Sequence, residues 1–145
     1  MSRFNLNEKK GLIVGIANQH SIAYACAKAC KEQGAELAIT YLNDKAKSYV
    51  EPLSSELDAT LFLPCDVTDE SQLDQLFEQV QQQWGQLDFL IHSIAFAPLE
   101  DLRGRLIDSS LDGFQLAMDI SCNSLMRLCK RAEPLMSEGG SVIAM

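Results

Sequence analysis

The segment GLIVGIANQHSIA, residues 11–23, decides the fold class. Residues 11–14 form an apolar run typical of a buried strand, and residues 21–23 lead into an alanine-rich segment typical of a helix. A turn between a strand and a helix N-terminus offers free backbone N–H groups and the positive end of the helix dipole. The segment has a single glycine at the turn, Gly15, so it fits either a phosphate-binding loop of unusual sequence or a simple helix start.

The rest of the chain alternates strand and helix patterns, which is typical of a parallel sheet covered by helices on both faces. The expected strands are residues 11–15, 35–41, 60–64, 87–95 and 141–145. The expected helices are residues 21–33 and 43–57, a helix from the cap Asp69 to its end at Gly85, and residues 111–136. The predicted fold is therefore α/β, a doubly wound parallel sheet of the Rossmann type, with residues 1–145 as one dinucleotide-binding domain.

The segment after the fourth expected strand carries two further expectations. The loop from Phe96 to about Ser110 is longer than a simple connection needs, which often indicates function. The helix that follows has one side expected to be buried, made of Phe114, Ala117, Leu125, Leu128, Cys129 and Ala132.

The last expected strand, 141–145, is apolar and is followed by no helix that could cover it. We therefore expect the natural protein to continue beyond Met145, with this chain as the N-terminal part of a longer fold.

Composition limits the function classes. With 145 residues the chain is long enough for one domain with a core, and no segment approaches the about 18 apolar residues of a membrane span. The formal net charge of −8 argues against a nucleic-acid partner, since phosphate contacts need clustered cations. Residues 1–10 have no apolar signal core, and the five cysteines include no C-x-x-C pair, so we expect reduced thiols, no metal site and a cytoplasmic location.

Ligands of open parallel sheets bind at the carboxyl ends of the strands. After the first strand, Gly15 and the small Ala17 allow close approach, and Ser21 can cap the helix and bond a phosphate oxygen. After the third strand, Asp66 can either recognise the edge of adenine or cap the next helix.

Two more strand ends complete this predicted site. His92 precedes small residues that leave room for a flat ring or a ribose, and it is interpreted as a core histidine rather than a base. The second strand ends at YLND (41–44), where the residue directly after the strand is neither acidic nor an arginine. This favours NADH over NADPH, although Lys45 and Lys47 follow closely.

Together these segments resemble the enoyl-acyl-carrier-protein reductases, a divergent branch of the short-chain dehydrogenase/reductases. That branch uses a G-x(5)-S-x-A loop, which residues 15–23 match at Gly15, Ser21 and Ala23. Further matches are AELAITYLNDK (35–45), CDV (65–67), HSIAFAP (92–98), GFQLAMDIS (113–121) and GGSVIAM (139–145).

The resemblance implies a role for each matching residue. The pyrophosphate would be held by Gly15, Ile16, Ala17, Ser21 and Ile22, the adenosine ribose by Leu42, adenine by Asp66 and Val67, the nicotinamide ribose by Ser93, Ile94 and Ala95, and the acyl chain by Phe96 and Ala97. Leu42 departs from the polar residue often found in the family, and Ala95 replaces a frequent glycine.

The activity that the resemblance implies is NADH-dependent reduction of the trans-2 double bond of enoyl-acyl-carrier-protein thioesters in fatty-acid biosynthesis. The catalytic tyrosine and lysine belong to a Y-x(6)-K pattern that would begin after Met145, and Tyr24, Tyr41 and Tyr49 lie in elements from which they cannot substitute. This chain alone is therefore expected to be inactive. The resemblance also implies a homotetramer, with residues 111–136 at a subunit contact.

Three alternatives stay open at this point. A non-catalytic fragment would bind NAD without turnover. A short-chain carbonyl reductase is disfavoured because HSIA (92–95) replaces the N-N-A-G of that group. A flavodoxin-like signalling module would need paired carboxylates after the first strand, where residues 12–15 have none.

Overall fold

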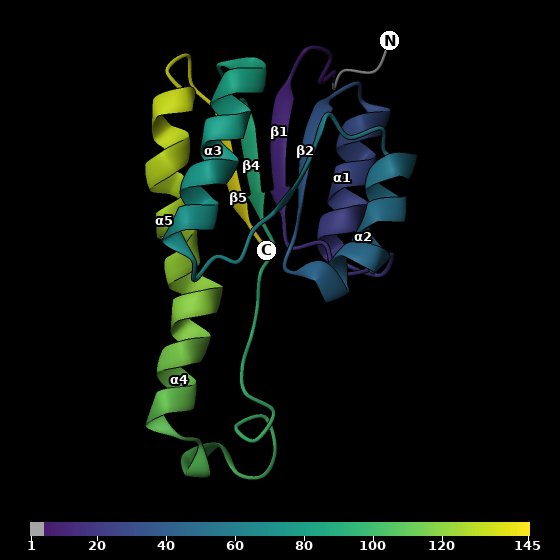
Figure 1. Ribbon diagram of the computed structural model, residues 1–145. Helices are drawn as coiled ribbons and strands as arrows, with labels where there is room; N and C mark the ends of the chain where they lie inside the picture. The colour runs from purple at the N-terminus through teal and green to yellow at the C-terminus, as the bar shows by residue number, and fades with distance from the viewer. Residues whose placement is uncertain (1–4) are drawn as a thin grey trace.

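Five parallel strands form one sheet in the computed structural model, which describes residues 5–145 (Figure 1). The strand order is β3-β2-β1-β4-β5. The strands are β1 (Lys10–Val14), β2 (Glu36–Tyr41), β3 (Leu61–Pro64), β4 (Phe89–His92) and β5 (Ser141–Ala144). Residues 1–4, where the segment without a signal core begins, lie outside the described residues.

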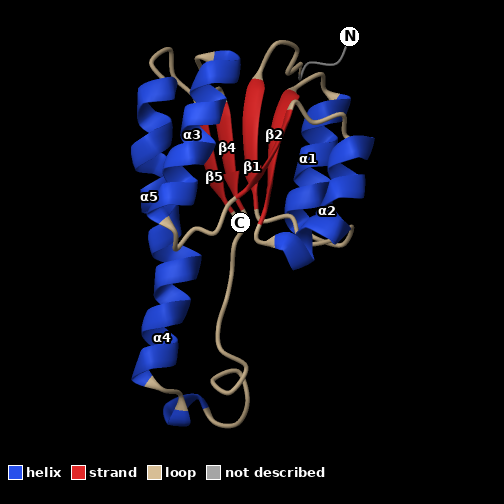
Figure 2. Cartoon of the chain, in the orientation of Figure 1, coloured by secondary structure: helices blue, strands red, loops and turns tan. Residues whose placement is uncertain are grey.

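Helices cover both faces of this sheet (Figure 2). One face carries α1 (Ile22–Glu32) and α2 (Asp44–Glu56), and the other carries α3 (Glu70–Trp84) and α5 (Ser124–Ala132). The chain also forms α4 (Leu111–Met118), a π-helical turn (Asp119–Asn123) and two 3₁₀ turns, Leu106–Asp108 and Glu133–Leu135. The predicted doubly wound fold is confirmed.

Successive side chains of the central strands point to opposite faces of the sheet, so a hydrophobic core forms on each face. Leu12 and Leu90 pack against residues of α3 and α5, whereas Ile13 and Ile39 pack against residues of α1 and α2. Leu12 and Ile13 are both fully buried. A strand buried on both faces must be apolar at every position, which explains why the run at residues 12–14 has no polar residue.

The helix ends follow the predicted local signals. Asp69 Oδ1 accepts from the backbone N–H groups of Ser71 and Gln72, and the Gln72 amide donates back to Asp69 Oδ2 at 3.2 Å. Gly34 follows α1 with φ +95°, and Gly85 ends α3 with φ +70°, a conformation that costs glycine little. The predicted cap and both predicted helix ends are confirmed.

Two boundaries were predicted wrongly. The fourth strand spans Phe89–His92 rather than residues 87–95, and it ends at His92 because its neighbour β1 ends at the paired residue Val14. The helix expected over 111–136 is interrupted by the π-helical turn, where the Ser124 N–H reaches the Asp119 carbonyl and the Ser124 hydroxyl donates to the Ile120 carbonyl at 2.6 Å.

The predicted buried side of residues 111–136 is correct only for the part that faces the sheet. Leu128 and Ala132 are fully buried, whereas Phe114 is 60% exposed. Phe114 lies in α4, and Figure 1 shows that this helix extends past the end of the sheet. Ala117, Leu125 and Cys129 are half-buried.

Gly15 lets two backbone segments touch. Its φ is +116°, and a Cβ placed on it would lie 1.9 Å from the Ser93 carbonyl oxygen. We expect Gly15→Ala to lower the free energy of unfolding by about 3 kcal/mol or more, because backbone strain and overlap act together. Urea denaturation monitored by circular dichroism measures this loss.

Gly104→Ala is the matched control, since Gly104 also has a positive φ, +83°, but has no atom within 4 Å of its Cβ position. It should cost only about 1 kcal/mol. Equal losses in the two variants would contradict the importance of the close contact.

Candidate cofactor-binding site

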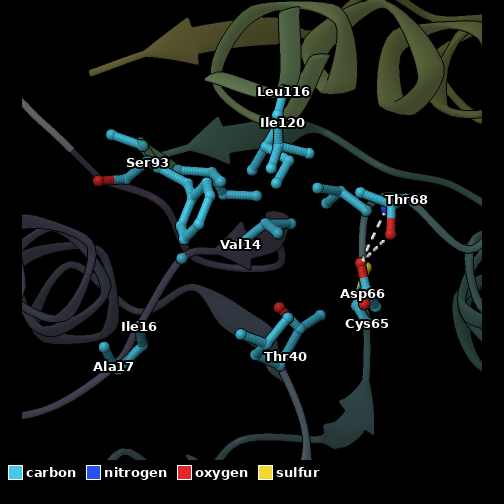
Figure 3. A pocket seen from close by; sticks show the side chains of 16 residues that line it. Val14, Ile16, Ala17, Thr40, Cys65, Asp66, Thr68, Ser93, Leu116 and Ile120 are labelled. Carbon is cyan, nitrogen blue, oxygen red and sulfur yellow. Dashed lines mark hydrogen bonds between the residues drawn. The ribbon is translucent and has the colours of Figure 1, made fainter. Parts of the chain in front are cut away.

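A pocket of about 400 Å³ lies at the carboxyl ends of the first four strands (Figure 3). It sits beside β1, where the strand order reverses: β2 and β3 lie to one side and β4 and β5 to the other. Such a switch point is where open α/β sheets bind ligands. The lining consists of Val14, Gly15, Ile16, Ala17, Thr40, Leu42, Cys65, Asp66, Val67, Thr68, Ser93, Ile94, Ala95, Phe96, Leu116 and Ile120.

The pocket brings together most of the residues predicted for the cofactor. These are Gly15, Ile16, Ala17, Leu42, Asp66, Val67, Ser93, Ile94 and Ala95, together with Phe96 from the predicted acyl pocket. Ser21, Ile22 and Ala97 are not part of the lining, and Ile22 is 59% exposed beside it on the first turn of α1. The individual roles of these residues remain predictions.

Ser21 closes the loop after β1. Its Oγ accepts from the backbone N–H groups of Ala17 and Asn18, both at 3.0 Å. Ser21 occupies the N-cap position of α1, but its side chain makes no cap hydrogen bond, so the predicted side-chain cap is wrong. The hydroxyl serves the loop instead, and it fixes the turn beside the pocket.

Asp66 fixes the turn after β3. Its Oδ1 accepts from the Thr68 backbone N–H at 2.9 Å and from the Thr68 hydroxyl at 2.7 Å (Figure 3). Its own N–H donates to the Gln72 side chain at 2.9 Å. Because Asp69 caps α3, the interpretation of Asp66 as that cap is wrong.

Cys65 lies next to this turn and lines the pocket, yet it is not a nucleophile. Burial, with a smaller effect of the Asp66 carboxylate, raises the pKa of its thiol to about 12. The thiolate is therefore scarce at neutral pH, and Cys65 acts as an apolar wall residue.

The helical wall of the pocket was missed from sequence. Leu116 of α4 and Ile120 of the π-helical turn point into the pocket from above the strand ends (Figure 3). Ser121 joins this wall to the loop after β4, since its Oγ accepts from the Phe96 N–H at 2.9 Å and donates to the Phe96 carbonyl at 3.1 Å. The match of residues 113–121 to a family pattern was the only available signal, and it assigned no ligand role.

His92 lies beneath the pocket with only 2% exposure. Its Nε2 is 2.7 Å from Ser124 Oγ, and because that hydroxyl donates to the Ile120 carbonyl, Nε2 carries the hydrogen. Nδ1 has no hydrogen-bond partner among residues 5–145, and burial lowers the pKa of the ring. His92 is the predicted core histidine, although only one of its nitrogens is satisfied.

The two serines of the interrupted helix face the home sheet. Ser124 is fully buried against His92, and Ser121 bonds the Phe96 backbone. Both serines therefore bond groups within the chain.

The chemistry of the lining suits binding more than reaction. Its described residues include backbone groups, hydroxyls and one carboxylate, but no tyrosine, lysine or histidine. Tyr41 instead packs on Phe62, with ring centroids 4.6 Å apart. Across residues 5–145, no three His, Cys, Asp or Glu side chains gather as metal ligands, and none of the helices is both long and apolar enough to span a bilayer.

A reversed strand order, a glycine turn at a helix N-terminus and a pocket over four strand ends define a doubly wound α/β fold of the Rossmann type. The family model described as enoyl-(acyl carrier protein) reductase matches residues 15–145. The chain belongs to that family.

Similar proteins support this assignment. The enoyl-[acyl-carrier-protein] reductase [NADH] 1 of Rhizobium meliloti is 44% identical over 140 residues, which are 97% of this chain and 52% of that protein. The reductase of Anaplasma phagocytophilum, solved in complex with NAD, is 44% identical with a TM-score of 0.92, covering 96% of this chain and 53% of that one. The Bacillus cereus reductase, solved with NADP⁺, is 38% identical with a TM-score of 0.92, covering 96% of this chain and 55% of that one. The chain thus spans about half the length of these relatives.

Burial of His92 predicts a pH dependence of stability. The folded pKa is lowered below the usual 6.5, so below about pH 6.5 the unfolded chain binds a proton that the folded chain does not. The contribution of the neutral His92 ring to the free energy of unfolding is therefore complete above that pH. It is lost as the pH falls toward the folded pKa, at up to about 1.4 kcal/mol per pH unit. Urea denaturation at pH 7.5 and 5.5 measures it.

In His92→Gln, the stability difference between these two pH values should shrink. His20→Gln changes an exposed histidine and should leave the difference as in the wild type. If His92→Gln keeps the full difference, the buried neutral ring is not its source.

Proposed function

We propose that this chain forms the cofactor-binding half of an NADH-dependent enoyl-acyl-carrier-protein reductase of fatty-acid biosynthesis. The observation that carries the proposal is the pocket at the strand-order reversal, lined by residues from all four strand ends that the family pattern predicts. Bound NADH would supply the hydride for the β-carbon of a trans-2-enoyl thioester on acyl carrier protein.

The loop after β1 would hold the pyrophosphate. Gly15, Ile16 and Ala17 line the pocket at the start of α1, where the helix dipole favours anions. Two N–H groups already occupy the lone pairs of the Ser21 hydroxyl, so this group can only donate to a ligand, as a phosphate oxygen requires. Ile22, on the first turn of α1, would cover the pyrophosphate from the same side.

The remaining strand ends would hold the two nucleoside halves. Leu42 would lie beside the adenosine ribose, and Asp66 with the Val67 backbone would recognise adenine. Asp66 Oδ1 is held by Thr68, which leaves the second carboxylate oxygen for the adenine amino group. Residues 93–95 would flank the nicotinamide ribose, and Phe96 and Ala97 would meet the acyl chain.

NADH is proposed over NADPH because no arginine lies at the end of β2. This strand end contributes Thr40 and Leu42 to the pocket. Lys47 lies 5.8 Å from the centroid of the Tyr41 ring, a cation–π contact that competes with a 2′-phosphate for the ammonium. Since a relative was solved with NADP⁺, the two cofactors should be compared directly.

The chain by itself would bind the cofactor without turning over substrate. In the family, a tyrosine and a lysine stabilise the enolate oxygen and the ribose, and the described lining contains neither. A non-catalytic nucleotide-binding fragment is therefore the second candidate, and the absent pair is the observation that favours it.

The proposed assembly is a homotetramer in the cytoplasm. Three large apolar side chains of α4 that do not line the pocket are exposed by 46–69%, as a helix at a subunit contact requires: Leu111, Phe114 and Met118. The five cysteines are all free, which suits a reducing compartment. The net charge of −8 favours neither nucleic acid nor an anionic membrane surface as a partner.

The loop assignment predicts that two substitutions weaken NADH binding. Ser21→Ala removes the hydroxyl that closes the loop, and Ala17→Asp places a carboxylate beside the pyrophosphate. Each should raise the Kd for NADH about 10-fold or more, the cost of one charge-assisted hydrogen bond or one close repulsion. Titration of NADH fluorescence measures the change.

Ala29→Asp is the matched control, because it adds the same charge to α1 at an exposed position outside the pocket lining. Its Kd should match the wild type. If Ser21→Ala and Ala17→Asp both bind NADH with unchanged affinity, the phosphate loop lies elsewhere.

A further inference from the structure

Arg127 of α5 connects two walls of the pocket. Its Nη1 donates to the Val67 carbonyl oxygen at 3.3 Å. Its Nη2 donates to Asp119 Oδ1 at 2.6 Å and its Nη1 to Asp119 Oδ2 at 3.3 Å, which is a bidentate pair. Its Nε lies 3.3 Å from Glu70 Oε1. One guanidinium therefore holds a backbone carbonyl and two carboxylates.

The Arg127 guanidinium bridges Val67 and Asp119, and these two residues belong to opposite sides of the site. Val67 is buried in the turn after β3 and lines the pocket. Asp119 begins the π-helical turn and directly precedes Ile120, which lines the pocket from the helical wall. The bridge thus links the turn after β3 to the wall above it.

The Asp119–Arg127 pair also spans the irregular part of the helix. The two residues are eight positions apart, and the π-helical turn lies between them. Asn123 donates to Asp119 Oδ1 at 3.0 Å, and this bond together with Arg127 lowers the pKa of the Asp119 carboxyl. Asp119 therefore stays charged well below neutral pH, and the pair can hold the turn in one geometry.

Arg131, one turn further along α5, provides an internal comparison. It pairs with Glu70 and Asp74 of α3, so it joins the same two helices as Arg127 does. Within residues 5–145 its hydrogen bonds and ion pairs go to Glu70, Asp74 and the Arg127 carbonyl, none of which lines the pocket. Stabilisation of the α3–α5 contact and positioning of the pocket wall can thus be separated.

We propose that Arg127 is a positioning residue for the adenosine half of a bound dinucleotide. It fixes the gap between the Val67 backbone and Ile120 at the width of a flat purine ring. This inference rests on the proposed function, since it takes the turn at residues 65–68 as the adenine end of the pocket.

The test compares Arg127→Met with Arg131→Met in the complete natural protein. Methionine keeps an apolar stem of similar length and removes the guanidinium. For Arg127→Met we expect the Kd for NADH and for ADP-ribose to rise about 5- to 10-fold, the range that loss of a charge-assisted bridge gives. The Kd for reduced nicotinamide mononucleotide should change less than about 2-fold, since that ligand has no adenosine.

Arg131→Met should leave all three Kd values within about 2-fold of the wild type. Arg127→Lys should recover only part of the loss, because one ammonium cannot donate in the fork geometry that reaches both Val67 and Asp119. Urea denaturation of both methionine variants reports their stability separately from binding.

Three results would overturn the inference. They are unchanged ADP-ribose binding in Arg127→Met, equal weakening by Arg131→Met, and full recovery in Arg127→Lys. Any of these, with saturable NADH binding by the wild type, would leave the proposed function standing. A wild-type protein that binds no NADH would overturn the proposed function and this inference together.

Discussion

The contact between the turn after β1 and the backbone after β4 governs the geometry of this molecule. The Ser93 N–H donates to the Val14 carbonyl at 2.9 Å, and Gly15 has no side chain that could hold the two segments apart. From this contact the chain leaves β1 toward α1 on one face of the sheet and leaves β4 toward the helices of the other face. The space between the diverging segments is the pocket, so fold and site depend on one close approach.

The parts of the fold that local sequence determines were predictable. Strands buried on both faces must be apolar throughout, as residues 12–14 are, and the Asp69 cap and the Gly85 end depend on groups within a few residues. No local pattern indicated the π-helical turn, and Ser124 at its end lies against His92, 32 residues earlier in the chain. The exposure of Phe114 likewise depends on where the sheet ends in space.

The same distinction applies to the site. Residues directly after a strand end are brought together by any parallel sheet, so Gly15, Asp66 and Ser93 could be predicted to line one pocket. Leu116 and Ile120 reach that pocket from the interrupted helix, which extends past the strand ends, and no local pattern reports such an approach. Ser21 shows that a local pattern can also mislead. It stands at the cap position of α1, but its hydroxyl bonds the loop after β1 instead of the helix.

We propose that the pocket beside β1 holds a dinucleotide. The most direct test is titration of ¹⁵N-labelled protein with NADH, followed by amide chemical shifts. We expect saturable binding at one site, with the largest shifts at residues 15–17, 66–67 and 93–95. Absence of saturable binding would contradict it, as would shifts centred on the separate cavity near Lys9, Cys30 and residues 138–141.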